Sequence, residues 1–87
     1  MGNFTGYIMR LGKLRIINLY AVDSQIATTK QLASKDYPGF TYTVRVWMPK
    51  TSSTDFGTVI FEVNSNGVLS SDQTVFRGGV VMAYFAA

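Results

Sequence analysis

The 87-residue chain contains no cysteine and no histidine, and few of its residues are charged. Without cysteine there is no disulfide bond and no thiolate metal site, and without histidine the commonest general base and metal ligand is missing. Catalytic triads built on these residues are therefore excluded. Charged residues make up 15% of the chain, against about 25% in an average soluble domain. A surface with so little charge predicts that an apolar part of it is covered by a partner.

The charged residues that are present do not form a cluster. The formal net charge of +3 comes from scattered basic residues, namely Arg10, Lys13, Arg15, Lys30, Lys35, Arg45, Lys50 and Arg77. This scatter favours a solvated, slightly basic surface over a nucleic-acid footprint. The acidic residues are Asp23, Asp36, Asp55, Glu62 and Asp72. All but Glu62 fall in expected loops, where aspartate commonly forms turns, so we expect no catalytic pair, no metal, no cofactor and no enzyme activity.

Long hydrophobic runs are also missing. No apolar run reaches the ~18 residues of a membrane span, and the N-terminus lacks the basic-then-apolar pattern of a signal peptide, so no membrane insertion is expected. Residues 1–87 predict a single domain, and the opening Met1-Gly2-Asn3 is compatible with the C-terminal fragment of a longer protein. A chain of this size buries only about two-thirds of its unfolded surface, so oligomerisation is the expected reinforcement.

Alternating apolar residues and regular turn signals predict an all-β domain. Strands are expected at residues 4–10, 14–22, 40–48, 57–63 and 68–70, and from residue 75 onward. The Asn66-Gly67 pair predicts a type I′ hairpin turn, because both residues tolerate a positive φ. The polar residues 23–37 predict a loop with at most one helical turn. We expect a small antiparallel, jelly-roll-like β-sandwich of six or seven short strands, or alternatively a small β-barrel.

The last strand is apolar on both faces. One face carries Val80, Met82, Tyr84 and Ala86, and the other carries Val81, Ala83, Phe85 and Ala87. A chain this small covers one face of a strand with its own core, and covering the second usually requires another layer or another copy. Val81, Ala83 and Phe85 are therefore predicted in a subunit interface. The preceding Gly78-Gly79 predicts a bulge or a close backbone approach.

The strand at residues 40–48 supplies the candidate binding site. Its apolar set, Tyr42, Val44, Val46 and Met48, is expected to face the core, which leaves Thr43, Arg45 and Trp47 on the other face. An indole beside a guanidinium can stack on a sugar ring or a base and hydrogen-bond to its edge. The alternative is that Trp47 packs under a neighbouring layer.

Aromatic residues beside loops add to this site. Tyr37, Phe40 and Phe56 flank expected loops, either as rim contacts for a ligand or as anchors that hold the loop to the core. The candidate ligand-binding residues are Arg45, Trp47, Thr43 and Tyr37.

Two stretches together resemble a known family. Residues 6–22 form a strand, an Arg-Leu-Gly-Lys turn and an apolar return strand, and residues 57–69 followed by 79–85 form a hairpin with Asn-Ser-Asn-Gly and a final strand rich in aromatics. This order of features resembles the C-terminal receptor-binding head domains of tailed-phage tail fibres and baseplate proteins. The resemblance implies a β-sandwich that forms a homotrimer around its C-terminal strands and binds host-surface glycans or proteins near subunit boundaries. The resemblance assigns a binding role to no individual residue of this chain.

These observations lead to one main hypothesis and two alternatives. The main hypothesis is a non-enzymatic host-attachment module of a phage tail fibre, located in a virion tail appendage, acting outside the cell and recognising a surface carbohydrate or receptor. The first alternative is a small β-barrel that binds single-stranded nucleic acid, although the scattered charge makes nucleic acid the less favoured partner. The second alternative is a purely structural virion or assembly protein.

Overall fold

The computed structural model describes the backbone of residues 5–26 and 29–87, and the side chains of residues 5–20 and 29–87. The described chain is almost entirely β. Its strands are β1 (Thr5–Leu11), β2 (Leu14–Ile26), β3 (Thr29–Gln31), β4 (Tyr42–Pro49), β5 (Phe56–Val63), β6 (Val68–Ser71) and β7 (Val75–Phe85). A single turn of 3-10 helix, η1 (Ser34–Asp36), lies between β3 and β4. The predicted all-β class is confirmed.

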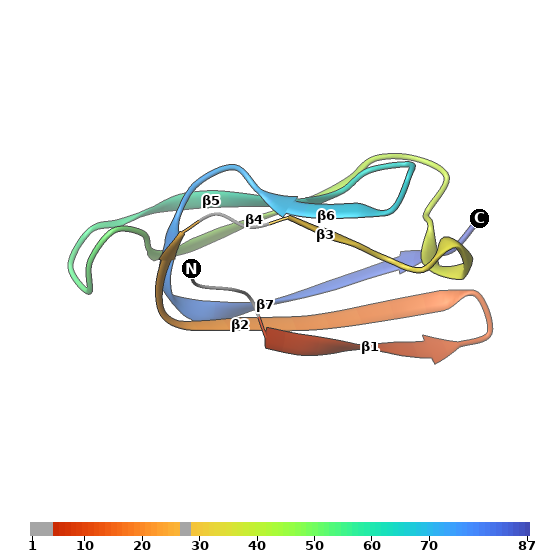
Figure 1. The fold of residues 1–87 in the computed structure, drawn as a ribbon, viewed down its shortest axis with the longest axis horizontal. Helices are drawn as coiled ribbons and strands as arrows, with labels where there is room; N and C mark the ends of the chain where they lie inside the picture. The colour runs from red at the N-terminus through yellow and green to blue at the C-terminus, as the bar shows by residue number, and fades with distance from the viewer. Residues whose placement is uncertain (1–4, 27–28) are drawn as a thin grey trace.

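The strands form two antiparallel sheets that lie one above the other (Figure 1). The three-stranded sheet has the order β1-β2-β7, and the four-stranded sheet has the order β3-β6-β5-β4. Because each sheet has its own hydrogen-bond ladder, the described chain forms a sandwich and not a closed barrel. The chain changes sheet between β2 and β3 and again between β6 and β7.

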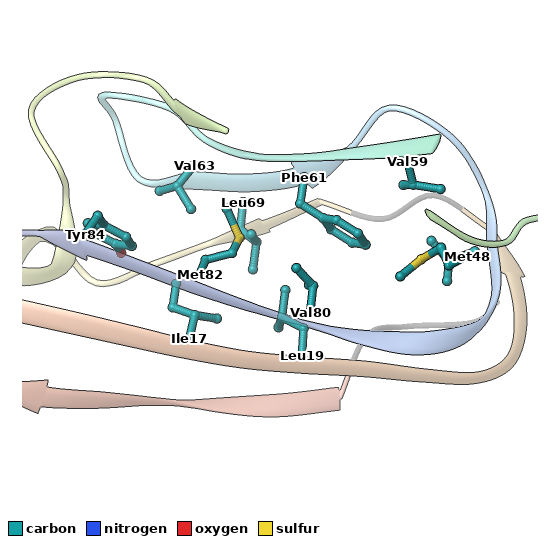
Figure 2. Close-up of a cluster of buried hydrophobic side chains, with 11 residues drawn as sticks. Ile17, Leu19, Met48, Val59, Phe61, Val63, Leu69, Val80, Met82 and Tyr84 are labelled. Carbon is teal, nitrogen blue, oxygen red and sulfur yellow. The ribbon is translucent and has the colours of Figure 1, made fainter. Parts of the chain in front are cut away.

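The hydrophobic core lies between the two sheets, and its side chains point into this space from both sides (Figure 2). The buried members are Ile17, Leu19, Met48, Val59, Phe61, Val63, Leu69, Val75, Val80, Met82 and Tyr84. Alternate residues of a strand point to opposite faces, so each strand contributes every second residue. The inward sets expected for residues 40–48 and for the final strand are confirmed. In β5 the inward residues are Val59, Phe61 and Val63.

Two of the hairpin turns contain a glycine with a positive φ. In the β1–β2 hairpin, Gly12 has a φ of 61°, a conformation that glycine adopts without steric cost. In the β5–β6 hairpin, the Gly67 amide donates to the Asn64 carbonyl at 2.9 Å, which places Ser65 and Asn66 at the centre of the turn. The expected type I′ turn centred on Asn66-Gly67 is therefore wrong. The observed arrangement, with Gly67 at a φ of 76° after the turn, is the longer hairpin loop closed by a left-handed glycine.

Residues 23–37 contain more regular structure than the sequence predicted. β2 continues to Ile26, and β3 follows as a short edge strand paired with β6. The expected loop is wrong here. β3 is polar on both sides, and it is held by backbone pairing with β6, a strand distant in sequence. A local hydrophobic period does not predict such pairing.

The glycine pair in β7 marks a close approach and not a bulge. The β2–β7 register is unbroken from Leu14↔Phe85 to Val22↔Arg77, and the irregularity falls beyond it, between Val22 and Ile26. A Cβ on Gly79 would lie 3.0 Å from the Leu19 carbonyl oxygen. The close-approach interpretation is confirmed at Gly79.

An ionic cluster around buried Asp36 fastens η1 to the three-stranded sheet. It lies at the end of the sandwich that holds η1 (Figure 1). The Asp36 carboxylate, only 1% exposed, accepts hydrogen bonds from Arg10 Nε and Nη2 at 2.8 and 2.7 Å and from Arg15 Nε at 2.6 Å. The Tyr84 hydroxyl donates to the Asp36 backbone carbonyl at 2.9 Å. The guanidinium of Arg10, helped by that of Arg15, holds the pKa of the Asp36 carboxyl below its ordinary value despite burial. This cluster fastens η1 to the β1–β2 hairpin.

Candidate binding surface

The candidate site lies on β4, an edge strand of the four-stranded sheet that pairs only with β5 among the described strands. The alternation of β4 turns Val44, Val46 and Met48 toward the core and leaves Thr43, Arg45 and Trp47 on the outer face of the sandwich. Pro49 ends the strand, because proline has no backbone N–H to donate to a ladder. The predicted orientation of this strand is confirmed.

Trp47 is the most exposed large hydrophobic side chain described, at 68% of its surface. The alternative in which Trp47 packs under a neighbouring layer is wrong for this chain. The reason is topological: the second sheet covers the opposite face of β4, and among the described residues no layer lies over the outer face. The indole is therefore available to a partner.

Phe56 and Thr58 extend this surface from β4 onto β5. The register places Thr58 directly opposite Trp47 and places half-exposed Phe56 opposite Pro49, so Phe56 is a diagonal neighbour of Trp47. Diagonal neighbours in a sheet are about 7–8 Å apart, within reach of aromatic side chains. Thr43, Arg45, Trp47, Phe56 and Thr58 are called the Trp47 face below. The sequence pattern alone does not assign Thr58 to a binding surface, and it places Phe56 only beside a loop. Neither residue can be assigned to this face before the β4–β5 register is known.

The outer surface of β4 and β5, which includes the Trp47 face, carries one basic and one acidic side chain, Arg45 and Glu62. Arg45 is exposed, and no ion pair or hydrogen bond of its side chain is found among the described side chains of residues 5–20 and 29–87. It stands two residues from Trp47, or about 7 Å along the strand. Glu62 lies on the same outer face, opposite Thr43. Lys50 is engaged elsewhere, since its ammonium donates to the Gln73 side-chain oxygen at 3.1 Å.

Tyr37 is not part of this face. Its hydroxyl oxygen accepts a hydrogen bond from Gln31 Nε2 at 2.8 Å, and its ring packs so closely on Gly67 that a Cβ there would lie 2.1 Å from Tyr37 Cδ1. These contacts place Tyr37 at the β5–β6 turn, whereas Trp47 pairs with Thr58 toward the opposite end of β5. Its contacts are those of a loop anchor.

A separate cavity of about 160 Å³ opens between the two sheets, on the side where β1 and β3 form the edges. It is lined by Gly6, Tyr7, Ile8, Ile17, Leu19, Lys30, Leu32 and Leu69. Ligand sites that orient polar molecules need several convergent polar groups, and this lining offers mainly aliphatic side chains. The cavity is therefore a poor fit for a sugar.

The predicted interface residues Val81, Ala83 and Phe85 lie on the outer face of the three-stranded sheet, on the other side of the sandwich from Trp47. All three are exposed, and Phe85 has 65% of its surface accessible. The structure thus brings Thr43, Arg45 and Trp47 together on one surface and places the expected interface residues on the opposite one.

The described side chains provide no metal site. Among those of residues 5–20 and 29–87, no three His, Cys, Asp or Glu residues lie close enough together to hold a metal ion. The same part of the chain contains no helix with the length and hydropathy of a membrane span. No protein-family model matches the chain, and neither curated proteins nor solved structures provide a significant match.

Proposed function

We propose that this domain is a non-enzymatic attachment module that binds a cell-surface carbohydrate through the Trp47 face. The observation that carries the proposal is the exposed indole of Trp47 beside the free guanidinium of Arg45 on one uncovered sheet surface. In this proposal the module works as a homotrimer at the tip of a phage tail fibre, in a virion appendage that acts outside the host cell.

The chemistry of the Trp47 face suits a sugar ring. The indole offers a large, flat apolar surface with little conformational entropy to lose, and a pyranose presents C–H groups on one of its faces. The Arg45 guanidinium carries several N–H donors about 7 Å away, within reach of ring hydroxyls or of a sugar carboxylate, which guanidinium binds in a bidentate manner. The Thr43 and Thr58 hydroxyls supply further polar contacts on both strands.

The shallow shape of this face predicts weak binding by one copy. A flat surface buries only part of a ligand, whereas tight small-molecule sites are concave. Presenting several copies on one appendage raises the overall avidity by about 10²–10⁴ without a new contact, provided that the spacing permits simultaneous binding. A repeated attachment module is consistent with this requirement.

The charge of the Trp47 face disfavours single-stranded nucleic acid. Arg45 and Glu62 cancel each other on this surface, and Lys50 is held by Gln73. A strand of phosphates needs a positively charged groove along its backbone, and most of its affinity comes from that charge. The outer face of β4 and β5 provides no such track.

The test is a glycan array followed by titration calorimetry with the best neutral and acidic oligosaccharides. Trp47→Ala is expected to abolish measurable binding, and Arg45→Gln to weaken acidic ligands more than neutral ones. Phe40→Ala is the matched control, because Phe40 is an exposed aromatic that precedes β4 and lies outside the Trp47 face. Unchanged binding by Trp47→Ala would contradict the proposal, as would salt-sensitive quenching of Trp47 fluorescence by single-stranded DNA.

A further inference from the structure

We infer that the outer face of the three-stranded sheet is a self-association surface, covered in solution by further copies of this chain. The inference gives the association of copies in the proposed function a contact surface, and it rests on that function only for the number of copies. It does not depend on carbohydrate binding, since the two surfaces lie on opposite sides of the sandwich.

The surface is defined by the register of β1, β2 and β7. Residues paired across antiparallel strands point to the same side, so four rows of side chains share this face. The rows are Leu11, Leu14 and Phe85; Met9, Ile16 and Ala83; Tyr7, Asn18 and Val81; and Thr5, Tyr20 and Gly79. These residues are called the apolar face below. None of them is charged, and Asn18 and Thr5 are the only strongly polar members.

The apolar face is largely open to solvent in the single chain. Tyr7 and Leu11 on β1 are each 59% exposed, and Val81 on β7 is 58% exposed. Single exposed hydrophobic residues are normal, but a contiguous patch across three strands is not. Such patches on small soluble domains mark interaction sites.

All three strands present exposed side chains on this face. Those of the two outer strands are exposed, whereas Leu14, Ile16 and Asn18 on the central strand are half-buried between them. Tyr20, also on the central strand, is 48% exposed. Two such faces can pack against each other with interdigitated side chains, as in sheet-on-sheet packing.

The available area matches what a specific interface requires. Three strands spaced about 4.8 Å apart over seven residues of about 3.3 Å each cover a projected area of about 330 Å², or about 500–600 Å² of accessible surface once side-chain relief is included. Two such faces together reach about 1,000–1,200 Å², the lower limit for specific protein interfaces. Covering the face removes about a tenth of the 4899 Å² accessible surface of the chain.

The free strand edges favour a protein partner over a lipid surface. β1 and β7 are the two edges of the three-stranded sheet, and each pairs only with β2 among the described strands. Their outer backbone N–H and C=O groups need hydrogen-bond partners, which another polypeptide can supply and hydrocarbon cannot.

The missing charge favours an identical copy over a foreign protein. Interfaces between different proteins gain much of their specificity and association rate from complementary charges. Interfaces between identical subunits are more apolar, and an uncharged face meets its own copy without repulsion. A small domain without disulfides also gains stability from self-association.

The experiment measures the solution mass of the full chain by light scattering on a sizing column from 1 to 200 µM. Wild type is expected to form a stable oligomer, and Val81→Lys and Tyr7→Lys are each expected to raise the dissociation constant by at least ~100-fold, because each leaves a charge buried against an apolar neighbour. Thr58→Lys is the matched control on the opposite sheet and is expected to keep the wild-type mass. Circular dichroism confirms that all variants are folded.

The other outcomes of this experiment either support or overturn the inference. A wild-type monomer at every concentration overturns the inference, and so does an oligomer that both lysine variants leave intact. A monomer that binds anionic phospholipid vesicles assigns the face to a membrane and also overturns it. Loss of glycan binding in Trp47→Ala with an unchanged mass supports both proposals, whereas failure of glycan binding by an intact oligomer overturns only the proposed function.

Discussion

The two outer faces of the sandwich have the same backbone geometry but different surroundings for their most exposed aromatics. Phe85 on the three-stranded sheet and Trp47 on the four-stranded sheet are 65% and 68% exposed. Around Phe85, the neighbouring residues on β2 and β1 are aliphatic or aromatic. Around Trp47, the same outer face carries Arg45 and Glu62 together with threonines.

This difference shows that exposure alone does not identify what an aromatic side chain binds. An indole with a guanidinium and hydroxyls beside it has polar groups to orient a small ligand. A phenyl ring among uncharged neighbours provides only apolar contact area, which suits binding to a large protein surface. The neighbours across the strands therefore decide between the two roles.

The largest expected effect comes from breaking the ionic cluster that fastens η1, which connects β3 of one face to β4, to the sheet that carries the other face. Asp36→Ala removes the carboxylate between Arg10 and Arg15 and leaves buried Arg15 without its ionic partner. Removing one partner of a buried pair typically costs about 3–5 kcal/mol in the free energy of unfolding. Urea unfolding measures this loss, and the control Asp55→Ala, in the exposed β4–β5 loop, is expected to cost less than ~1 kcal/mol. Equal losses for the two variants would show that the cluster does not stabilise the attachment of η1 to the β1–β2 hairpin.

The next largest effect is expected from Gly6→Ala, which disturbs the apolar face and leaves the Trp47 face intact. A Cβ on Gly6 would lie 1.8 Å from the Asn18 carbonyl oxygen, so Gly6→Ala forces β1 away from β2. We expect a loss of about 2–3 kcal/mol, as in overpacked cores, together with loss of self-association and retention of glycan binding. Gly12→Ala is the comparison at the turn of the same hairpin. Nothing lies within 4 Å of a Cβ at Gly12, so its cost is limited to the strain of a φ of +61°, about 1–2 kcal/mol. A Gly6→Ala protein that still oligomerises like wild type contradicts this expectation.

A smaller effect is expected from acid, which weakens the Asp36 cluster without removing its carboxyl group. Arg10 and Arg15 lower the pKa of the Asp36 carboxyl in the folded state, whereas the unfolded chain restores a value near 3.9. The unfolded state therefore binds the proton first, so the stabilisation is complete above about pH 4 and is lost as the pH falls through the lower, folded-state pKa. Unfolding measured from pH 7 to pH 2 should show this loss in wild type. The Asp36→Asn variant should lack that part of the acid slope, and parallel acid slopes would contradict the assignment.

The smallest expected effect is a difference in thermal stability between Phe85→Ala and Trp47→Ala. In the dilute single chain, Phe85→Ala and Trp47→Ala should each change the free energy of unfolding by no more than ~0.5 kcal/mol, because both side chains are exposed. At high protein concentration, only Phe85→Ala should lower Tm, since it removes contacts made between copies. Calorimetry of both variants at a low and a high protein concentration measures these Tm values. Equal Tm values for the two variants at both concentrations would remove the distinction between the faces.

Local patterning determined much of this protein. Alternation along residues 40–48, 57–63 and 80–86 set which side chains of β4, β5 and β7 face inward, because the period of a strand is two and one face must leave water. Gly12 and Gly67 marked two hairpins, and the absence of cysteine and histidine removed whole classes of chemistry. The same alternation placed Arg45 and Trp47 together on the outer side.

Only the tertiary structure decided how these strands meet. The register of β4 with β5 brought Phe56 and Thr58 to the Trp47 face, and the order β1-β2-β7 turned three separate apolar stripes into one apolar face. The pairing of β3 with β6 and the burial of Asp36 between two arginines likewise join segments far apart in sequence. Period-two patterns carry no information about which strand lies beside which, since that choice depends on long-range pairing and on the packing of the whole core.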